Sequence, residues 1–569
     1  MEDKYEKINK LAKRRGFFWQ SYEIYGGVGG LISLGPLGLA LKNNIVEKWR
    51  RMFVIPYQDF IVEIETPIIA PARIFEASGH IEHFTDYIVE CLKCRRKFRA
   101  DHLLEDVLGI KGAEKLSAED MNKLIKEREV SCPECKGPLG PVQKFNLLFK
   151  TTIGPYSDHI GYARPETAQG MFLNFHRIYE VMGRRLPLGI AQIGKVMRNE
   201  ISPRQGPIRL REFTIMEIEL FFDPSNPSCG YLTDVTDERL RILRYNYEKP
   251  VELRVGEAVK EGVIVSEWNA FFMALSKRFL TSLGIPEDKQ MFVEKAPEER
   301  AHYSIQTFDQ VVYTERWGWV EVSGHAYRTD YDLKRHMEYS GRDLRAYRFK
   351  GEGVVKRTLQ VKPVIRKIVE DFGKENMSSI LRALGSLRPE EVATALDGGG
   401  LRLEVEELGT VELRKEHVAI VVKEEKSYVE RFVPHVAEPS FGTERLLYVV
   451  LEYAYSERKG RVVLSIPKDL APIKVAVFPL VKDPKLCQLA DEIYRSLKEG
   501  GFTVIKEEEG SIGKRYAKAD EIGVPFAVTV DRESLNEGTV TVRDRDTWEQ
   551  VRVSINELTR YLKGLLSAS

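Results

Sequence analysis

Two segments in which polar and apolar residues alternate constrain this fold more than any other feature. Residues 213–222 read FTIMEIELFF and residues 317–323 read WGWVEVS. Because successive side chains of a strand point to opposite faces of its sheet, each segment predicts a strand with one polar and one apolar face. Strand-like apolar runs also begin at Phe145 and continue in residues 188–194. The middle of the chain is therefore expected to contain strands that carry polar side chains to one face.

The chain before Pro67 predicts two helices, a glycine-rich turn and a strand. The first fifteen residues place basic side chains at helical spacing beside an apolar face, which is typical of a solvated amphipathic helix. The glycine-rich turn is Gly26-Gly27-Val28-Gly29-Gly30. A second helix is expected over Leu39–Phe53, between Pro36 and Pro56, and the β-branched run Asp59–Pro67 predicts a strand.

From Ala471 the pattern changes to strands that alternate with helices. Strands are expected over residues 473–480, 502–505 and 526–530, and helices over residues 486–499 and 512–522. Because a helix connects each pair of strands, this pattern predicts a small α/β domain with a mainly parallel sheet.

Length and composition limit the class of protein. A chain of 569 residues is too long for one hydrophobic core, so about three or four domains are expected. The 86 basic and 85 acidic residues exclude a globally basic coat for nucleic acid, but not a local patch. The sequence shows neither an apolar run of the ~18 residues of a membrane span nor a secretory signal. Its six cysteines fit a reducing compartment, so a cytoplasmic location is expected.

Four of the cysteines form two C-x-x-C pairs, Cys91 with Cys94 and Cys132 with Cys135. Each pair can place two thiolates on one tetrahedral cation, and the neighbouring basic residues favour the deprotonated form. The alternative is four reduced structural cysteines. We favour a structural zinc site, because both pairs fall in one short segment and four ligands leave no open position for catalysis.

Arginines and acids are concentrated after residues 188–194. Arg198-Asn199-Glu200 is followed by a polar turn over residues 202–207 and then by residues 208–213. This order predicts that Arg198 and Arg209 lie on neighbouring antiparallel strands and face one cleft. Arginine binds carboxylate and phosphate bidentately, and Phe213 offers an aromatic face to a heterocycle. Taken alone, the pattern favours a salt-bridged surface hairpin.

Two further segments are turns. Residues 164–170 (RPETAQG) lead into an apolar run, and residues 438–445 (EPSFGTER) open a predicted helix over residues 446–455. A glycine-containing turn with an arginine at a helix start suits an anionic ligand, but alone it is weak evidence.

Together these segments resemble a class II aminoacyl-tRNA synthetase, most closely the glycyl-tRNA synthetases of the dimeric archaeal and eukaryotic type. The strand closing at Pro67 resembles the first motif of that class, residues 198–219 the second and residues 438–445 the third. Residues 98–103 (FRADHL) and 317–322 (WGWVEV) resemble further parts of the glycyl enzymes. The segment from Ala471 resembles their anticodon-binding domain, so the similarity spans nearly the whole chain.

The resemblance implies an α+β protein, in which a class II antiparallel-sheet catalytic core with insertions precedes a C-terminal α/β anticodon-binding domain. The core is expected over residues 1–87, which hold the dimer-interface motif, over 146–345, and over 426–469, which hold the third motif. Insertions are expected at 88–145 for zinc, at about 232–310, and at 346–425 for a possible tRNA contact. The anticodon-binding domain is expected at 470–569.

The implied activity is the ATP-dependent attachment of glycine to tRNA(Gly) through a glycyl-adenylate. Attack of a carboxylate on the α-phosphorus brings two anions together, so the site needs positive charge and positioning more than a nucleophile. By resemblance, Arg198 contacts the α-phosphate and the substrate carboxylate. Arg209 and Arg445 hold the other phosphates, and Glu200 orients the adenine amino group. The implied ATP-binding set is Arg198, Asn199, Glu200, Arg209, Leu210, Phe213, Glu321, Val322 and Arg445, of which Arg198, Glu200, Arg209 and Arg445 are the catalytic residues.

Glycine offers only its ammonium, its carboxylate and its lack of a side chain for recognition. The implied glycine-binding set is Arg99, Glu166, Glu217, Glu438, Pro439 and Ser440. Within it, Glu166, Glu217 and Ser440 are expected at the ammonium and Arg99 at the carboxylate. Magnesium accompanies ATP, and Glu321 and Glu438 are its implied ligands, because a hard cation prefers oxygen. No editing site is expected, since no smaller amino acid competes.

The implied partners are tRNA(Gly) and a second copy of the chain in a homodimer. Residues 342–367 carry nine basic and two acidic residues, with Tyr347 and Phe349 between them. This mixture suits an RNA backbone with stacking, and a solvated charged segment fits it equally well.

Two other functions remain open from the sequence. A catalytically inactive synthetase-like paralogue, acting as an accessory or regulatory subunit, would keep the fold without ATP chemistry. The joint presence of Arg198, Glu200, Glu438 and Arg445 favours the enzyme. A ligase for another amino acid is disfavoured by residues 164–167 and 438–440.

Overall fold

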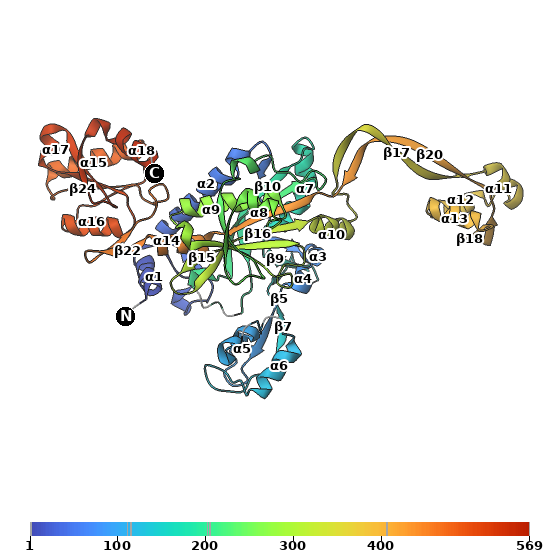
Figure 1. The fold of residues 1–569 in the computed structure, drawn as a ribbon, viewed down its shortest axis with the longest axis horizontal. Coiled ribbons are helices and arrows are strands. Elements are labelled where there is room, and N and C mark those ends of the chain that lie inside the picture. Colours follow the sequence, from blue (N-terminus) through green and yellow to red (C-terminus); the bar gives the residue numbers. More distant parts are fainter. Residues whose placement is uncertain are drawn as a thin grey trace. The chain divides into compact units, whose positions relative to one another are not determined.

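The structure is a computed structural model that describes residues 3–110, 112–113, 116–156, 158–201, 203, 206–405 and 408–567, without the side chains of 351–358, 425–427 and 567. The chain forms two compact units (Figure 1). The first consists of Met1–Leu344 with Val433–Ser569, and the second is Arg345–Phe432. Residues 202, 204 and 205 of the predicted turn at 202–207 lie outside the described residues.

A nine-stranded sheet, in the order β13-β12-β14-β15-β16-β21-β11-β10-β3, forms the centre of the first unit. Its strands are β3 (Ile61–Glu63), β10 (Leu188–Met197), β11 (Glu212–Phe222), β12 (Arg239–Leu243), β13 (Val251–Arg254), β14 (Gln290–Glu294), β15 (Gln306–Thr314), β16 (Gly318–Thr329) and β21 (His435–Gly442). Neighbouring strands are antiparallel except for β3 with β10 and β12 with β14. The predicted antiparallel core sheet is confirmed, and the alternating segments belong to β11 and the start of β16.

The two faces of this sheet have different environments, because side chains alternate along each strand. Met216, Ile218 and Leu220 of β11 point into the main hydrophobic core. The helices α2 (Pro36–Phe53), α9 (Glu267–Ser282) and α14 (Thr443–Ala454) supply many of the remaining core side chains. On the other face, α7 (Ala168–Val181) packs against Phe221 through Phe172 and Phe175. The rest of that second face carries the polar residues of β11, β16 and β21.

Three expectations differ from the structure near this sheet. The strand expected over Asp59–Pro67 is confined to β3, because only Ile61–Glu63 pair with β10 at the sheet edge. Residues 208–211 are not a strand: the 3-10 turn η4 (Gly206–Ile208) contains Pro207, which cannot donate a ladder hydrogen bond, and β11 begins at Glu212. Residues 232–310, expected as an insertion, supply β12, β13 and β14 to the central sheet and α9 to its core.

Residues 85–146 form a lobe with a hydrophobic core of its own. The strand β5 (Thr85–Glu90) pairs with β6 (Lys97–Arg99) and with β7 (Gln143–Asn146). The helices α5 (Ala100–Leu108) and α6 (Ala118–Glu127) contribute Leu104 and Met121 to the same core. Cys91 and Cys132 are buried there, so the lobe encloses the predicted zinc ligands.

The second unit consists of a long ribbon and a small helical end. The ribbon pairs β17 (Ala346–Pro363) with β20 (Val418–Phe432). The end contains α11 (Ile365–Phe372), α12 (Met377–Gly385), α13 (Pro389–Asp397) and the hairpin of β18 (Leu401–Val405) with β19 (Gly409–Leu413). Ile368, Ile380 and Val392 are buried in its own core, and the segment expected at 346–425 lies within this unit.

The C-terminal segment has the predicted α/β fold. The parallel strands β25 (Val504–Lys506), β24 (Val475–Pro479) and β26 (Phe526–Val530) are followed in the sheet by antiparallel β27 (Thr539–Asp544) and β28 (Gln550–Ser554). Its helices are α15 (Pro484–Glu499), α16 (Ile512–Glu521), α17 (Arg532–Glu537) and α18 (Leu558–Ser567). Hydrophobic clusters lie on both faces of this sheet, as expected for a doubly covered parallel sheet.

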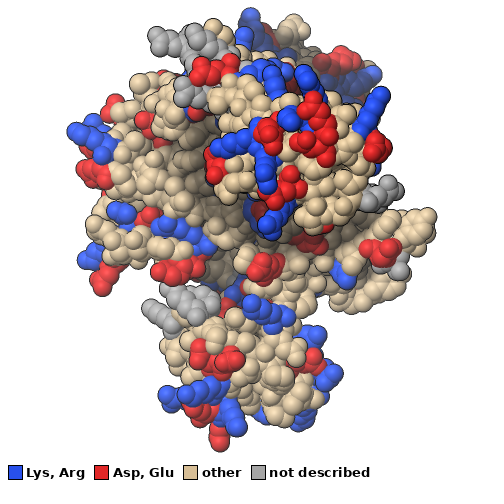
Figure 2. Space-filling view, turned by 90° about the vertical axis from the view of Figure 1, so that its right-hand side faces the viewer, with Lys and Arg blue, Asp and Glu red and all other residues tan. Residues whose placement is uncertain are grey.

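Shorter elements complete the first unit. They are α1 (Lys4–Arg15), β1 (Phe18–Gln20), β2 (Ile32–Leu34), β4 (Ile69–Pro71), α3 (Ala72–Ala77), α4 (His80–His83), β8 (Phe149–Thr152), β9 (Ile160–Ala163), α8 (Val255–Lys260), α10 (Tyr331–Ser340), β22 (Tyr455–Arg458) and β23 (Arg461–Leu464). Among the described residues, no helix combines the length and the apolar character that crossing a membrane requires. Figure 2 shows one face of the molecule, where basic and acidic side chains are interspersed, as the balanced net charge predicts.

Candidate functional site

A cavity of about 240 Å³ opens on the polar face of the central sheet. Its floor is made by residues at alternate positions of three adjacent strands. Ser440 of β21 lies opposite Glu217 of β11 on one side and opposite Gly324 of β16 on the other. Because directly opposed residues of antiparallel strands share a face, the register brings these positions together.

Most of the predicted site residues line this cavity. They are Arg198, Glu200, Arg209, Leu210, Phe213, Glu321, Val322 and Arg445 of the ATP set, and Glu166, Glu217, Glu438 and Ser440 of the glycine set. Asn199, Pro439 and Arg99 are not among the lining residues. The Asn199 amide donates to the Leu147 carbonyl (2.7 Å), and Pro439 lies within β21 opposite His325.

Arg99 lines a neighbouring cavity, which shares Glu200 and Arg209 with the first. Its guanidinium lies 3.3 Å from Asp86 and donates to Asp101 at 3.0 Å. Because two carboxylates already surround this guanidinium, the geometry gives no support to Arg99 as the ligand of the glycine carboxylate.

Three arginines converge at one end of the cavity. Arg198 directly follows β10; its Nε donates to the Pro165 carbonyl (3.1 Å), and its guanidinium lies 5.4 Å from the centre of the Phe213 ring. Arg445, in the first turn of α14, donates to the Ile208 carbonyl (3.0 Å). Arg209 donates to the Glu200 carboxylate at 2.8 Å. Fixed guanidinium groups beside an aromatic ring suit a ligand that combines phosphates with a flat heterocycle.

Three buried carboxylates gather at the other end of the cavity. Oxygen atoms of Glu217, Glu219 and Glu438 lie within 4.8 Å of one another. Burial raises the pKa of Glu219 well above its ordinary value, and the charge of Glu438 adds to this effect. Burial raises the pKa of Glu438 as well, although Arg328 opposes that shift. Among the described side chains, neither carboxylate oxygen of Glu219 has a hydrogen-bond partner. Such a cluster favours a bound cation.

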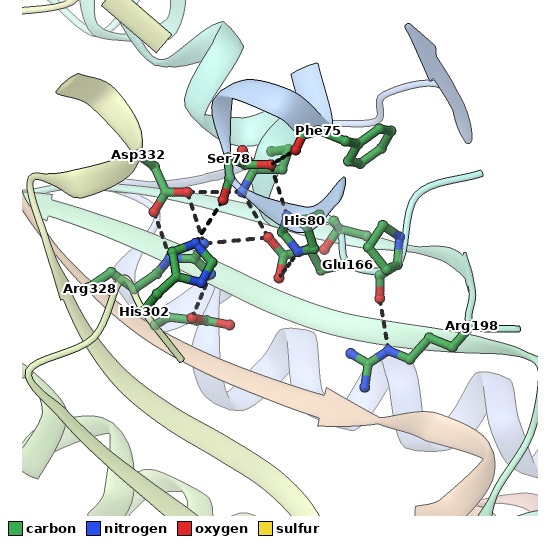
Figure 3. Close-up of polar contacts among 12 residues, drawn as sticks. Phe75, Ser78, His80, Glu166, Arg198, His302, Arg328 and Asp332 are labelled. Atoms are coloured by element: carbon green, nitrogen blue, oxygen red, sulfur yellow. Dashed lines mark hydrogen bonds and ion pairs between the residues drawn. The ribbon is translucent and has the colours of Figure 1, made fainter. Parts of the chain in front are cut away.

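Arg328, at the end of β16, is the positive charge embedded in this cluster (Figure 3). It is fully buried, and its guanidinium lies 3.0 Å from Asp332, 3.0 Å from Glu438, 3.4 Å from Glu166 and 3.9 Å from Glu219. The Tyr303 ring covers it, with its centre 3.7 Å from Cζ. One guanidinium thus faces four carboxylates, so the acids outnumber the fixed cations around it.

Glu166 connects this cluster to the turn before α7. Its carboxylate accepts from Gln169 (2.8 Å) and lies 3.5 Å from His80 Nε2. Burial alone would raise the pKa of Glu166, but the charges of Arg328 and His80 more than offset that effect and hold it well below the usual range. Glu166 therefore stays ionised in the pocket.

Sequence reasoning did not identify Arg328, Glu219, Asp332 or His80. A signal existed for the first two. Glu219 continues the alternation of Phe213, Ile215 and Glu217 on β11, and Arg328 has the same parity as Gly324 and Ala326 on β16. Following the alternation along each strand would have found both residues.

The two acids expected to hold magnesium lie at opposite ends of the cavity. Glu438 lies opposite Ala326 in the strand register, five positions (326 − 321) from Glu321. Because Val322 is the extra residue of a β-bulge, the backbone separation is about 13 Å at the ~3.3 Å rise of a strand residue. Glu321 lies 3.6 Å from Arg445 at the arginine end, whereas Glu438 belongs to the carboxylate cluster. Of these two acids, Glu321 is therefore the one that lies beside an arginine of the predicted ATP set.

The four paired cysteines come together in the lobe of residues 85–146. Their sulfur atoms lie within 4.8 Å of one another, with Cys91 Sγ 3.5 Å from Cys135 Sγ and Cys94 Sγ 3.7 Å from Cys132 Sγ. Four sulfurs around one zinc at ~2.3 Å are separated by about 3.8 Å, so this arrangement fits a tetrahedral zinc ion. All six cysteines of the chain, each within the described residues, are free of disulfides.

The comparisons with known proteins agree with the fold. Residues 474–565 match the family described as the anticodon binding domain. With the antiparallel sheet and the arginine-lined cavity, this domain defines a class II aminoacyl-tRNA synthetase. The chain is 52% identical to a glycine–tRNA ligase of Aeropyrum pernix, over 99% of this chain and 97% of the relative. It is 49% identical to that of Pyrococcus furiosus and 42% identical to that of Methanocaldococcus jannaschii, each over 99% of both chains. The chain therefore belongs to the glycine–tRNA ligase family.

Proposed function

We propose that this protein attaches glycine to tRNA(Gly) in two steps, through a glycyl-adenylate formed from glycine and ATP. One observation carries the proposal: a single cavity is lined by three buried carboxylates, Glu166, Glu217 and Glu438, and by three arginines, Arg198, Arg209 and Arg445. An amino acid that lies between them pairs its ammonium with the acids and presents its carboxylate to the arginines. The full-length similarity to glycine–tRNA ligases specifies glycine as the amino acid.

In the first step, the glycine carboxylate attacks the α-phosphorus of ATP, and pyrophosphate leaves. Arg198, beside Phe213 and the Pro165 carbonyl, neutralises charge on the attacking carboxylate and the α-phosphate. Arg209 and Arg445 hold the leaving phosphates, and Phe213 stacks on the adenine. Magnesium bound with ATP would further neutralise the phosphates, and Glu321 would ligate it.

At the other end, Glu217, Glu438 and Ser440 receive the glycine ammonium, with Glu166 and Glu219 completing the negative surroundings. Gly324 has no side chain, and a Cβ at that position would meet nothing within 4 Å, so the open space there belongs to the cavity.

In the second step, the terminal ribose hydroxyl of tRNA attacks the activated carbonyl, and AMP leaves. We place the reaction in the cytoplasm, in keeping with the free cysteines.

We also propose a homodimer and a tRNA contact in the second unit. β3 is an edge strand, and the exposed apolar side chains of Ile68 and Ile69 follow it, which suits a two-fold interface. For tRNA, the basic strand β17 is partly neutralised, because Arg348 and Lys350 both pair with Glu430. Arg366 and Lys367 also pair with an acid, Glu370, so the contact is expected to depend on the net positive charge of residues 342–367 and not on a single unpaired side chain. Sedimentation of a monomer at micromolar concentration would exclude the dimer.

ATP–pyrophosphate exchange with each of the twenty amino acids tests the central proposal. Exchange is expected with glycine and with no other amino acid, because the full-length relatives are glycine–tRNA ligases. Absence of exchange with every amino acid would support an inactive paralogue instead. Transfer of labelled glycine to tRNA then checks the second step.

A further inference from the structure

Arg211 lies two residues after Arg209 and two before Phe213 in the chain, but it is not among the residues that line the cavity. Its Nε and Nη2 donate to the Glu200 carbonyl at 3.0 and 2.8 Å, and its Nη1 donates to the Gly29 carbonyl at 2.8 Å. Its backbone amide donates to the Gly30 carbonyl (2.7 Å), and its own carbonyl accepts from the Arg198 amide (2.8 Å). One residue therefore connects Arg198, Glu200 and the glycine-rich turn Gly26–Gly30.

The glycine-rich turn can reach Arg211 only because it lacks side chains at the contact. Gly30 adopts φ +75°, and a Cβ there would lie 2.6 Å from Pro203 Cγ and 3.2 Å from Arg211 Cγ. Gly26 adopts a similar conformation, with φ +89°, but a Cβ at that position meets nothing within 4 Å. The turn thus presents the carbonyls of Gly29 and Gly30 to Arg211 at close range. This contact gives a reason for glycine at position 30, which lies outside the cavity.

The groups that Arg211 holds are the ones that contact ATP in the proposed function. Glu200 is bound through its carbonyl, while its carboxylate accepts from Arg209. Arg198 is bound through its amide, while its guanidinium lies beside Phe213. Hydrogen bonds from a guanidinium are stronger than bonds between neutral groups, so the Arg211 side chain restrains the Glu200 carbonyl strongly, whereas the Arg198 amide is held by the Arg211 backbone carbonyl. A displacement of about 1 Å in such groups can reduce a rate ~100-fold.

We propose that Arg211, anchored on Gly29 and Gly30, is a positioning residue that sets Arg198 and Glu200 for ATP. Arg211 acts through these two residues and does not itself touch substrate. This inference rests on the proposed use of ATP at the cavity. The alternative is that Arg211 only stabilises the fold, in which case its substitution would lower the melting temperature without a selective effect on ATP.

The first test is Arg211→Gln, with Arg211→Lys as the conservative variant and Arg560→Gln as a matched surface control. Arg560 lies in α18, and its side chain is 83% exposed. Pyrophosphate exchange is measured with ATP and glycine varied separately, beside a melting curve. Arg211→Gln is expected to lower kcat/KM for ATP roughly 10- to 100-fold and to change the KM for glycine less than about twofold. Lysine should restore activity only in part, because one ammonium lacks the forked geometry.

The second test compares Gly30→Ala with Gly26→Ala. Both variants place alanine in a left-handed conformation, but only the Cβ at Gly30 pushes against Pro203 and Arg211. Gly30→Ala is expected to reproduce the ATP defect of Arg211→Gln, whereas Gly26→Ala should retain wild-type kinetics.

The results separate the inference from the function on which it rests. Equal losses for ATP and glycine, a lowered melting temperature with unchanged kinetics, or equal effects of the two glycine variants would overturn the positioning role. If the wild-type protein fails to exchange with any amino acid, the proposed function fails. Calorimetric ATP binding by the same variants then decides the role of Arg211: an affinity equal to that of wild type overturns it.

Discussion

The Arg328 guanidinium lies 3.0 Å from the carboxylate of Glu438, a residue that lines the cavity, and both side chains are buried. The same guanidinium also forms ion pairs with Glu166, Glu219 and Asp332, so a single cation stabilises four carboxylates. Removing one partner of a buried ion pair is costly, because the remaining charge has neither water nor a counter-ion.

Arg328→Met is therefore expected to destabilise the catalytic core by about 3–5 kcal/mol and to abolish glycine binding. Arg328→Lys should lose less, since it keeps the charge but not the planar fork. Melting curves and equilibrium glycine binding check this pair of variants. A melting temperature equal to that of wild type for Arg328→Met would contradict the central role of this residue.

Glu217→Gln should weaken glycine binding far more than ATP binding. The Glu217 carboxylate accepts from the Thr167 amide (3.0 Å) and hydroxyl (2.5 Å), so the side chain is oriented before substrate arrives. The amide keeps these contacts but loses the charge that pairs with an ammonium, which is worth ~1.5–3 kcal/mol, or roughly tenfold to a hundredfold in affinity. Separate titrations with glycine and ATP measure the difference. Equal losses for both ligands, with a lowered melting point, would show a structural role instead.

Gly324→Ala should reduce glycine binding without unfolding the protein. Gly324 lies opposite Ser440, and the added methyl group would enter open space in the cavity. The position does not have a positive φ, so alanine brings no backbone strain there. Gly230→Ala is the matched control, because its Cβ also meets nothing within 4 Å and Gly230 does not line the cavity. Glycine KM and melting temperature, measured for both variants, check the expectation that only the first raises KM.

One zinc ion per chain is expected on Cys91, Cys94, Cys132 and Cys135. Metal analysis of the purified protein checks the stoichiometry. Cys132→Ser should lose the metal and unfold the lobe of residues 85–146, because these sulfurs lie within its small core. Cys487→Ser, which changes a cysteine outside the cluster, should retain the zinc ion. A wild-type protein without zinc, with four freely titratable thiols in the lobe, would contradict the site.

Asp309 should make the protein less stable as pH rises from about 4 to 7. Burial raises the pKa of this carboxyl to about 7, and the charge of Glu321 adds to the shift, while Lys295 and Arg445 oppose it. Its unfolded pKa is about 3.9, so across this window the folded state binds a proton that the unfolded state has released. The contribution of Asp309 to the free energy of unfolding is therefore fully present below pH ~4 and is lost as the pH approaches 7.

Asp309→Asn removes this titration. Between pH 5 and pH 8, the melting temperature of this variant should fall less than that of the wild-type protein. Asp237→Asn is the control, since the Asp237 side chain is 87% exposed. Identical pH profiles for Asp309→Asn and wild type would show that Asp309 is not the titrating group.

The sequence predicted local structure best where the pattern depends on near neighbours. The alternation in residues 213–222 gave β11, and residues 526–530 coincide with β26. The strand expected over Asp59–Pro67 was too long, because its length depends on a partner, β10, that lies far away in the chain. The membership of residues 232–310 in the central sheet depends on such distant pairing as well.

The same distinction applies to the site. Arg198, Glu217 and Arg445 could be placed from short motifs that resemble known ones. Arg328 belongs to no such motif, and its importance comes from acids on β11, β21 and α10 that converge only in the fold. The separation of Glu321 from Glu438 likewise follows from strand register, which a single sequence does not reveal.

The crowding of Glu217, Glu219 and Glu438 has a consequence for the thermodynamics of substrate capture. Glu219 and Glu438, whose pKa values are raised by burial, retain protons while the pocket is free, and an arriving ammonium favours their ionised forms. Glycine association should therefore expel protons into the solvent. The apparent heat of association in a calorimeter would then vary with the ionisation enthalpy of the buffer, and the slope of that dependence would count the protons released for each glycine captured.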